Sequence, residues 1–364
     1  MSRKIIIAGG GTGGHIFPAV AIANALKKIN PAIEILFVGA NGKMEMEKVP
    51  QAGYQIRGID IAGFNRSSLI KNISLPFKIV KSFIQVSGIV KSFQPDAVIG
   101  VGGYSTFPVL RYAQSKGIPT FIHESNSFAG KANIMLGKKA DKVFVASDGM
   151  QKFFPAQKIM ITGNPVRKNI AESRISRDEG MHFFGLDPAK KTVLVTGGSL
   201  GAKTINETIA GSIDLIINSG MQLIWQTGKP FAAEAKKLTE GKINVWTNDF
   251  ITQMEYAFAA ADIVISRSGA MAIAELCIVK KPVIFVPYPF AAEDHQTVNA
   301  KQLVEKNAAI MVSDKEAKQE LVKVLIELAA NEDKQNELKN NIGKLAVTNA
   351  DEQVAKEILS IIND

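Results

Sequence analysis

Cysteine is nearly absent from this chain, which has one in 364 residues, and tryptophan occurs only twice. The single cysteine, Cys277, can form no intrachain disulfide and offers no zinc-finger spacing, which suits a reducing compartment. Long apolar runs are also missing: none approaches the roughly 18 residues that cross a bilayer, and the run after Lys4 stops too soon for a signal peptide. We therefore expect a cytoplasmic protein without a membrane-spanning helix.

Acidic side chains are scarce in the first half of the chain. Residues 1–165 carry 20 Lys and Arg against 8 Asp and Glu, whereas residues 166–364 carry 23 against 26, so the positive net charge belongs to the first half. A basic surface is typical of proteins that bind nucleic acid or anionic lipid, and it also favours solubility. No helix-turn-helix or aromatic-basic pattern accompanies the charge, so we expect no nucleic-acid partner.

Short β-branched segments alternate with helix-length segments, the pattern of a parallel sheet covered by helices. The series runs twice, as KIIIA, EILFVG, DAVIGVGG, PTFIHE and KVFVAS, then as TVLVTGG, QLIWQTG, INVWTN, ADIVISRSG and PVIFVPYP. A polar, proline-containing segment separates the two series. We therefore predict two α/β domains, residues 1–163 and 164–349, and an amphipathic helix over 350–364 that packs back on the first domain.

A glycine-rich turn, GGGTGGH from Gly9 to His15, follows the first predicted strand and precedes an alanine-rich helix. Such a turn directs unpaired backbone N–H groups and the positive end of a helix dipole at one point, so it suits a phosphate or pyrophosphate. His15 directly follows the turn. It could act as a general base or merely cap the helix start, and this stretch alone leaves both roles open.

The same turn also satisfies the G-x-G-x-x-G pattern of dinucleotide-binding proteins. That pattern needs an acidic residue at the end of the second strand to hold a ribose hydroxyl. The second predicted strand ends in Gly39, Ala40 and Asn41, so no carboxylate is present there. The sequence therefore disfavours NAD or FAD.

Two further glycine-rich turns, Gly100–Pro108 and Gly197–Gly201, follow other predicted strands. Because open α/β sheets bind ligands at the carboxyl ends of their strands, three such turns in two domains predict one cleft lined from both sides. In the second half, Glu275 lies on a predicted helix after the polar turn SRSGA, where its carboxylate could accept both hydroxyls of a ribose. The polar residues 293–296 follow the next strand, where an attached sugar would lie.

The sequence resembles the bacterial MurG family in seven motifs that span nearly the whole chain: GGGTGGHIFPAVAIA, VGGYSTFP, HESNSFAGKAN, TGNPVR, TGGSLGA, SRSGAMAIAE and EDHQTVNA. The resemblance implies a GT-B fold, in which two Rossmann-like parallel-sheet domains face each other across a cleft. It also implies an inverting transferase that moves N-acetylglucosamine (GlcNAc) from UDP-GlcNAc to lipid I, undecaprenyl-pyrophosphoryl-N-acetylmuramoyl-pentapeptide. The product would be lipid II, used in peptidoglycan synthesis.

The resemblance also assigns a binding site for the donor UDP-GlcNAc. The positions that match the family's donor-binding residues are Thr12, Gly13, Gly14, Asn126, Arg167, Ser199, Ile251, Ala270, Met271, Ala272, Ile273, Ala274, Glu275 and Gln296. Among them, Ile251 would lie beside the uracil, Glu275 on the ribose and Gln296 on the sugar. The charge of Arg167 and the hydroxyl of Ser199 suit the pyrophosphate.

The implied reaction needs a base for the acceptor hydroxyl and stabilisation of the charge that grows on the leaving UDP. His15 is the predicted base and Glu124 the second candidate. Backbone donors at turns and helix starts would stabilise the pyrophosphate. The sequence contains no D-x-D motif, so we expect neither a metal nor another cofactor. The alternatives are a UDP-sugar 2-epimerase of the same fold and an NAD-dependent oxidoreductase.

The acceptor is expected on the first domain, at Gly102, Gly103 and Tyr104. A helix over 77–93 would carry apolar residues around most of its circumference, more than a surface helix needs for its own core. Since the tail of lipid I stays in the bilayer, this segment is predicted to dock on anionic lipid. A helix buried on most sides is the alternative. The residues assigned to docking are Lys71, Phe77, Lys78 and Lys81.

These assignments place the protein at the cytoplasmic face of the inner membrane, as a peripheral protein. Its predicted ligands are UDP-GlcNAc, lipid I and the anionic membrane surface. Proteins of cell-wall synthesis and cell division are candidate partners, which would connect the chain to cell shape and the cell cycle.

Overall fold

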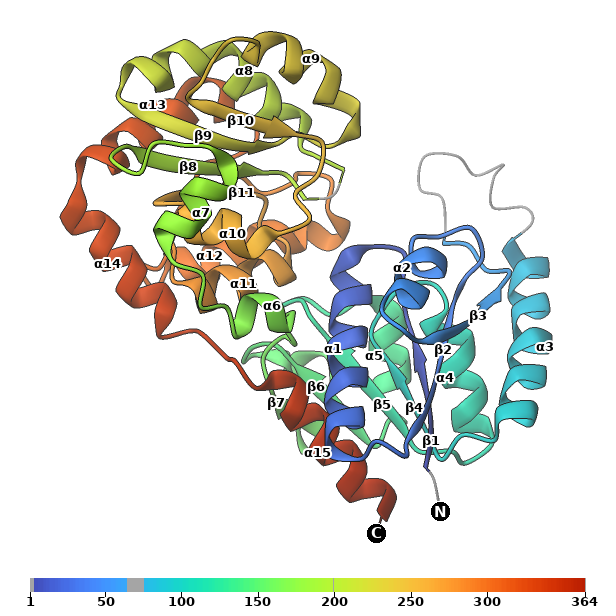
Figure 1. The fold of residues 1–364 in the computed structure, drawn as a ribbon. Coiled ribbons are helices and arrows are strands. Elements are labelled where there is room, and N and C mark those ends of the chain that lie inside the picture. Colours follow the sequence, from blue (N-terminus) through green and yellow to red (C-terminus); the bar gives the residue numbers. More distant parts are fainter. Residues whose placement is uncertain (1–2, 64–74, 199, 364) are drawn as a thin grey trace. The chain divides into compact units, whose positions relative to one another are not determined.

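The computed structural model describes residues 3–63, 75–198 and 200–363. The chain forms two compact units, one combining residues 1–167 with 349–364 and the other spanning residues 168–348 (Figure 1). Each unit is a parallel sheet with helices packed on it. This confirms the predicted pair of Rossmann-like α/β domains.

The sheet of the first unit has seven strands within the described residues, in the order β3-β2-β1-β4-β5-β6-β7, and all of its pairs are parallel. The strands are β1 (Lys4–Ala8), β2 (Glu34–Ala40), β3 (Gln55–Ile59), β4 (Ala97–Gly100), β5 (Thr120–Glu124), β6 (Lys142–Val145) and β7 (Ile159–Ile161). The strand order reverses between β1 and β4. Sheets of this kind bind ligands at that point, beyond the carboxyl ends of the strands.

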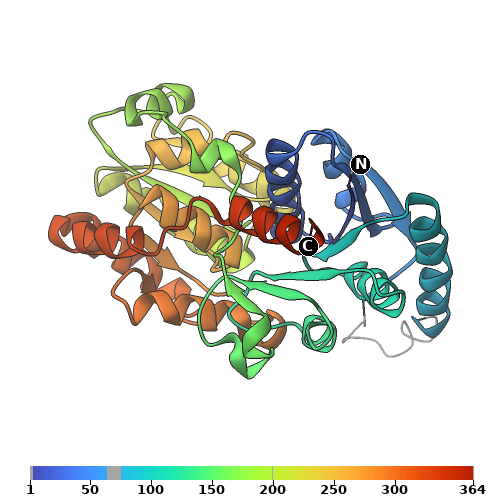
Figure 2. The same cartoon turned by 90° about the horizontal axis from the view of Figure 1, so that it is seen from below.

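Helices cover both faces of this sheet. Successive side chains of β1 point to opposite faces, so the apolar residues of this strand contribute to a core on each side. Ile5 and Ile7 belong to a core that includes residues of α1 and α15, whereas Ile6 and Ala8 belong to a core that includes residues of α3, α4 and α5. Figures 1 and 2 show α15 alongside α1. The helices are α1 (Gly13–Ile29), α2 (Glu45–Gln51), α3 (Leu75–Phe93), α4 (Thr106–Ser115), α5 (Lys131–Gly137) and α15 (Ala350–Asn363).

The second unit has a six-stranded parallel sheet in the order β10-β9-β8-β11-β12-β13, counted over the residues described. Its strands are β8 (Lys191–Thr196), β9 (Met221–Gln226), β10 (Val245–Asn248), β11 (Ile263–Ser266), β12 (Val283–Phe285) and β13 (Ile310–Met311). The order reverses between β8 and β11. Its helices are α6 (Lys168–Ala171), α7 (Arg177–Phe184), α8 (Lys203–Asn218), α9 (Lys229–Thr239), α10 (Met254–Ala260), α11 (Ala270–Val279), α12 (His295–Val304), α13 (Ala317–Ala330) and α14 (Glu332–Gly343).

All ten strands predicted from the sequence are present, and three more were not predicted: β3, β7 and β13. These three lie at sheet edges and are only partly buried; β3 is interrupted by polar residues, and β7 and β13 have only three and two residues. Among the helices of the described ranges, none is both long and apolar enough to cross a membrane.

The buried His123 on β5 makes the first unit sensitive to acid. Its Nε2 lies 3.3 Å from the carbonyl oxygen of Gly163, to which it must donate, and burial lowers the pKa of His123 to about 4. Between pH 6.5 and 4 the unfolded chain therefore binds a proton at this residue that the folded chain does not. The free energy of unfolding falls as the pH drops through that window, by about 2 kcal/mol at pH 5.

We predict that His123→Gln, which keeps an N–H donor but does not titrate, loses less stability than wild type between pH 7 and pH 5. Denaturant titrations at both pH values measure the two differences. Equal losses in wild type and variant would contradict a buried neutral histidine.

Candidate functional site

Two glycine turns of the first unit pack backbone against backbone at the β1/β4 switch point. The N–H of Gly10 donates to the carbonyl oxygen of Gly102 at 3.1 Å, and a Cβ on Gly103 would overlap the backbone of Gly10. Gly10, Gly102 and Gly103 have φ values of 151°, 98° and 94°, a region that favours glycine. The turn after β1 and the turn after β4 therefore form one structure, with Tyr104 at its edge packed on Gly63.

His15 lies in the first turn of α1, beside this pair of turns. Its Nδ1 is 2.9 Å from the carbonyl oxygen of Gly10. Because a carbonyl can only accept, Nδ1 must carry the proton, and the lone pair of the neutral ring is then on Nε2. A Cβ on Gly102 would lie only 2.7 Å from Nε2, so a side chain at that position would crowd this nitrogen. The arrangement suits a general base better than a helix cap.

The start of α1 offers backbone donors next to His15. The N–H groups of Gly13 and Gly14 belong to the first turn, where an α-helix lacks internal acceptors, and the side chain of Thr12 makes no capping hydrogen bond. Arg167 lies close by, with its guanidinium carbon 4.8 Å from the ring centroid of Phe17 on α1. The structure therefore brings a fixed positive charge to the helix start where the sequence predicts an anion.

Glu124, the second candidate base, is buried at the end of β5 and organises the loop that follows. Its carboxylate accepts from the backbone N–H of Asn126 at 3.1 Å, from Gly130 at 3.1 Å and from the side chain of Asn133 at 2.8 Å, and the side chain of Asn126 lies 3.4 Å away. These partners occupy both oxygens. The geometry favours Glu124 as a support for the Asn126 loop over a role as base.

In the second unit, the turn after β8 and the loop after β10 are joined by Gln226, a residue that sequence reasoning missed. Its side chain donates to the carbonyl oxygen of Gly198 at 2.9 Å and accepts from the N–H of Ile251 at 3.0 Å. Ile251, the predicted uracil neighbour, is thereby fixed beside the glycine turn. Ser199 of that turn lies outside the described residues.

The predicted ribose and sugar residues lie on α11 and α12. Glu275 and Met271 are buried on α11, whereas Ala270, Ala272, Ile273 and Ala274 are half-buried. The side chain of Gln296 accepts from the N–H of Tyr288 at 3.0 Å, and its backbone carbonyl accepts from Ser268 at 2.8 Å. The first bond ties the start of α12 to the loop after β12, and the second ties it to the turn that begins α11.

Arg267 was also not predicted as a site residue from the sequence. It connects the loops that follow β11, β12 and β13. It donates to the carbonyl oxygens of Val286 and Pro287, both at 2.9 Å, and pairs with Asp314 at 2.5 Å. Asp314 in turn accepts from Thr204 of α8. A local pattern could not reveal this network, because its members are separated by up to 110 positions in the chain.

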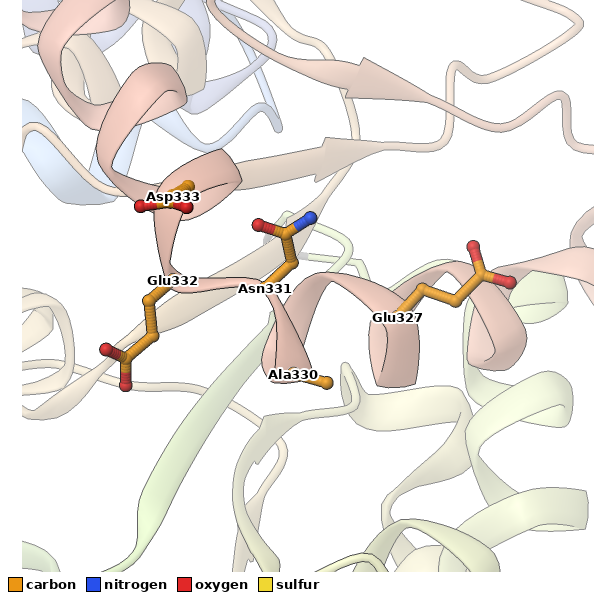
Figure 3. A pocket seen from close by; sticks show the side chains of 5 residues that line it. All are labelled: Glu327, Ala330, Asn331, Glu332 and Asp333. Carbon is orange, nitrogen blue, oxygen red and sulfur yellow. The ribbon is translucent and has the colours of Figure 1, made fainter.

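Carboxylates also gather around a hollow where α13 meets α14, lined by Glu327, Ala330, Asn331, Glu332 and Asp333 (Figure 3). The labelled acidic side chains point in different directions and offer no common centre. In the described part of the chain, no group of three His, Cys, Asp or Glu side chains could hold a metal ion. The hollow is remote in sequence from every predicted site residue and adds none to the site.

Both units match domains of a known protein family. Residues 5–145 match the glycosyltransferase family 28 N-terminal domain, and residues 192–356 match the glycosyltransferase family 28 C-terminal domain. A protein of Phocaeicola vulgatus is 51% identical over 98% of this chain and 96% of its own length. It is named UDP-N-acetylglucosamine–N-acetylmuramyl-(pentapeptide) pyrophosphoryl-undecaprenol N-acetylglucosamine transferase.

Solved structures agree at the level of fold. The crystal structure of MurG from Acinetobacter baumannii superposes with a TM-score of 0.79 at 28% identity, over 98% of this chain and 99% of that one. A UDP-GlcNAc 2-epimerase from Neisseria meningitidis, solved with UDP-GlcNAc bound, has a TM-score of 0.69 at 14% identity, over 98% of this chain and 100% of that one. The second likeness is one of fold alone.

Proposed function

Because this chain belongs to glycosyltransferase family 28, and within it to the family of MurG transferases, we propose that it transfers GlcNAc from UDP-GlcNAc to lipid I and so produces lipid II. The substrates follow from its relatives. The structural observation that best supports the chemistry is the pair of glycine turns that holds His15 with its Nε2 lone pair available beside a helix start.

The proposed reaction is a single displacement at the anomeric carbon of GlcNAc. The acceptor hydroxyl of lipid I gives its proton to Nε2 of His15 as its oxygen bonds to that carbon, and the bond from the carbon to the UDP oxygen breaks. The transition state has oxocarbenium character, and negative charge grows on the pyrophosphate. Fixed N–H donors stabilise this charge without reorganising, which is why helix starts suit the role.

We assign the donor to the residues of the second unit described above, with Glu275 on the ribose, Ile251 beside the uracil and Gln296 on the sugar. Gln226 and Arg267 support these residues by fixing the loops that carry them.

On the first unit, Thr12, Gly13 and Gly14 are assigned to the donor pyrophosphate with Arg167 and Asn126. Gly102, Gly103 and Tyr104 are assigned to the acceptor.

We further propose that the first turns of α3 dock on anionic lipid. Phe77, Val80 and Ile84 are 78%, 62% and 68% exposed and share one face of the helix, since they are spaced at i, i+3 and i+7. Ser82, Val86, Ile89 and Val90 occupy the opposite face and are buried. The exposed face therefore has no role in the core of the unit.

Two of the predicted lysines have different surroundings. Lys78 is exposed, whereas Lys81 pairs with Asp60 at 2.8 Å, and this pairing lowers the pKa of Asp60 to about 2. Lys81 therefore offers a membrane less net charge than the sequence suggests. Lys71 lies outside the described residues.

We also propose that proteins of cell-wall synthesis and cell division meet the enzyme at this membrane surface.

The transfer itself is the first prediction from this proposal. Incubation with labelled UDP-GlcNAc and a soluble analogue of lipid I should move the label to the acceptor and release UDP. Conversion of UDP-GlcNAc to UDP-N-acetylmannosamine without an acceptor would instead indicate an epimerase. Oxidation or reduction of a nicotinamide cofactor would indicate an oxidoreductase.

His15→Ala is expected to lower kcat by about 100-fold, because it removes the base, with little change in the KM for UDP-GlcNAc. His182→Ala, a change of an exposed histidine on α7, is the matched control and should leave kcat unchanged. A His15→Ala enzyme with normal kcat would return His15 to a capping role.

Glu275→Ala should instead weaken the binding of UDP, because it removes the carboxylate assigned to the ribose. Calorimetry measures this affinity.

For the membrane surface, Phe77→Ser/Ile84→Ser should bind anionic vesicles much more weakly than wild type in co-sedimentation, while activity on a short-chain soluble acceptor is kept. Ile243→Ser, a change of an 85% exposed apolar residue in the second unit, serves as the control and should bind like wild type. Added salt should weaken wild-type binding, because lysines contribute to it. Equal binding by the double variant would remove α3 as the membrane face.

A further inference from the structure

A buried carboxylate lies behind the glycine turn and has no role in the reaction described above. Glu45 is the first residue of α2 and is 1% exposed. It lies 34 positions from Gly11 in the chain, and none of the seven motifs contains it. A buried carboxylate is costly unless it is well hydrogen-bonded, so its partners indicate its role.

The two oxygens of Glu45 each accept one backbone hydrogen bond. Oε2 accepts from the N–H of Gly11 at 2.7 Å, and Oε1 accepts from the N–H of Ala40 at 2.9 Å. Ala40 is the last residue of β2, so the carboxylate ties the glycine turn to the end of the neighbouring strand. Backbone hydrogen bonds to a carboxylate are among the stronger ones in proteins.

Two glycines make room for this carboxylate. A Cβ on Gly10 would overlap the carboxylate of Glu45, and a Cβ on Gly39 would lie 2.5 Å from its Cγ. Gly11 itself has a φ of 88°, so its N–H direction depends on a conformation that other residues rarely adopt. The turn is therefore shaped around Glu45 as well as around any bound anion.

The peptide group held by Glu45 is the one that orients His15. The N–H of Gly11 and the carbonyl of Gly10 belong to the same planar peptide unit. Glu45 accepts from one end of this unit, and Nδ1 of His15 donates to the other end at 2.9 Å. Donation to a carboxylate polarises the peptide and makes its carbonyl a better acceptor.

We infer that Glu45 is a positioning residue for His15, acting through the Gly10–Gly11 peptide to fix the ring and to keep its lone pair on Nε2. The pair corresponds to a carboxylate–histidine dyad with one peptide group inserted between its members. This inference rests on the proposed role of His15 as the base.

The decisive experiment is a double-mutant cycle between Glu45→Gln and His15→Ala, with kcat and KM measured for transfer to the soluble lipid I analogue. A glutamine can accept from only one of the two N–H groups, because its amide nitrogen would face the other. In the wild-type background, Glu45→Gln should lower kcat by about ten-fold and leave the KM for UDP-GlcNAc within about two-fold. In the His15→Ala background it should lower kcat no further.

The pH dependence of kcat separates positioning from a merely structural role. Loss of the carboxylate weakens the polarisation of the peptide and makes the base less basic, so the acidic limb of the kcat profile should move to lower pH in Glu45→Gln. Glu47→Gln, a change of an exposed glutamate on the same helix, is the matched control and should shift neither kcat nor the profile. Thermal unfolding of each variant shows whether it is folded, and Glu45→Asp replaces Glu45→Gln if the latter is not.

Three results would overturn the inference: an unchanged kcat in Glu45→Gln, an equal loss of kcat in both backgrounds, or a loss confined to KM. If His15→Ala alone retains normal kcat, the proposed base is wrong instead, and the cycle shows this independently of Glu45.

Discussion

The contact between the turns after β1 and β4 is the constraint on which the proposed active site depends. Gly10 donates to Gly102, and Gly103 approaches so closely that only glycine fits. The same Gly10 offers its carbonyl to His15. A Cβ on Gly103 would overlap the backbone of Gly10, one on Gly102 would crowd the ring of His15, and one on Gly10 would overlap the carboxylate of Glu45. The glycines are therefore needed for the geometry of the proposed base.

The second unit also holds the loops at one edge of its sheet in fixed positions, but it does so with side chains and not with contacts between glycine turns. There the loops at the carboxyl ends of the strands are joined by buried polar side chains, Gln226 between the turns after β8 and β10 and Arg267 between the loops after β11, β12 and β13. Each of these side chains bonds to backbone groups, so the positions of the loops are fixed.

Much of the fold and part of the candidate site could be predicted from the sequence. The features that could not be predicted were hidden for physical reasons. Central strands and the glycine turn with His15 are local patterns, so ten strands, the two-domain fold and the candidate base could be predicted. Glu45, Gln226 and Arg267 could not, because all but one of the partners described above lie at least 19 positions away in the chain, and an isolated Glu, Gln or Arg resembles a surface residue. The ion pair between Lys81 and Asp60, which alters the predicted membrane face, was hidden for the same reason.

The proposed role of His15 as a base requires that the fold fix which ring nitrogen carries the proton. Nitrogen-15 NMR of the histidine-labelled enzyme, at about pH 8.5 where an ordinary imidazole is neutral, reads this directly. We expect the signature of a proton on Nδ1 and a lone pair on Nε2 for His15, assigned by its loss in His15→Ala. A proton on Nε2, or rapid exchange between both forms, would contradict it.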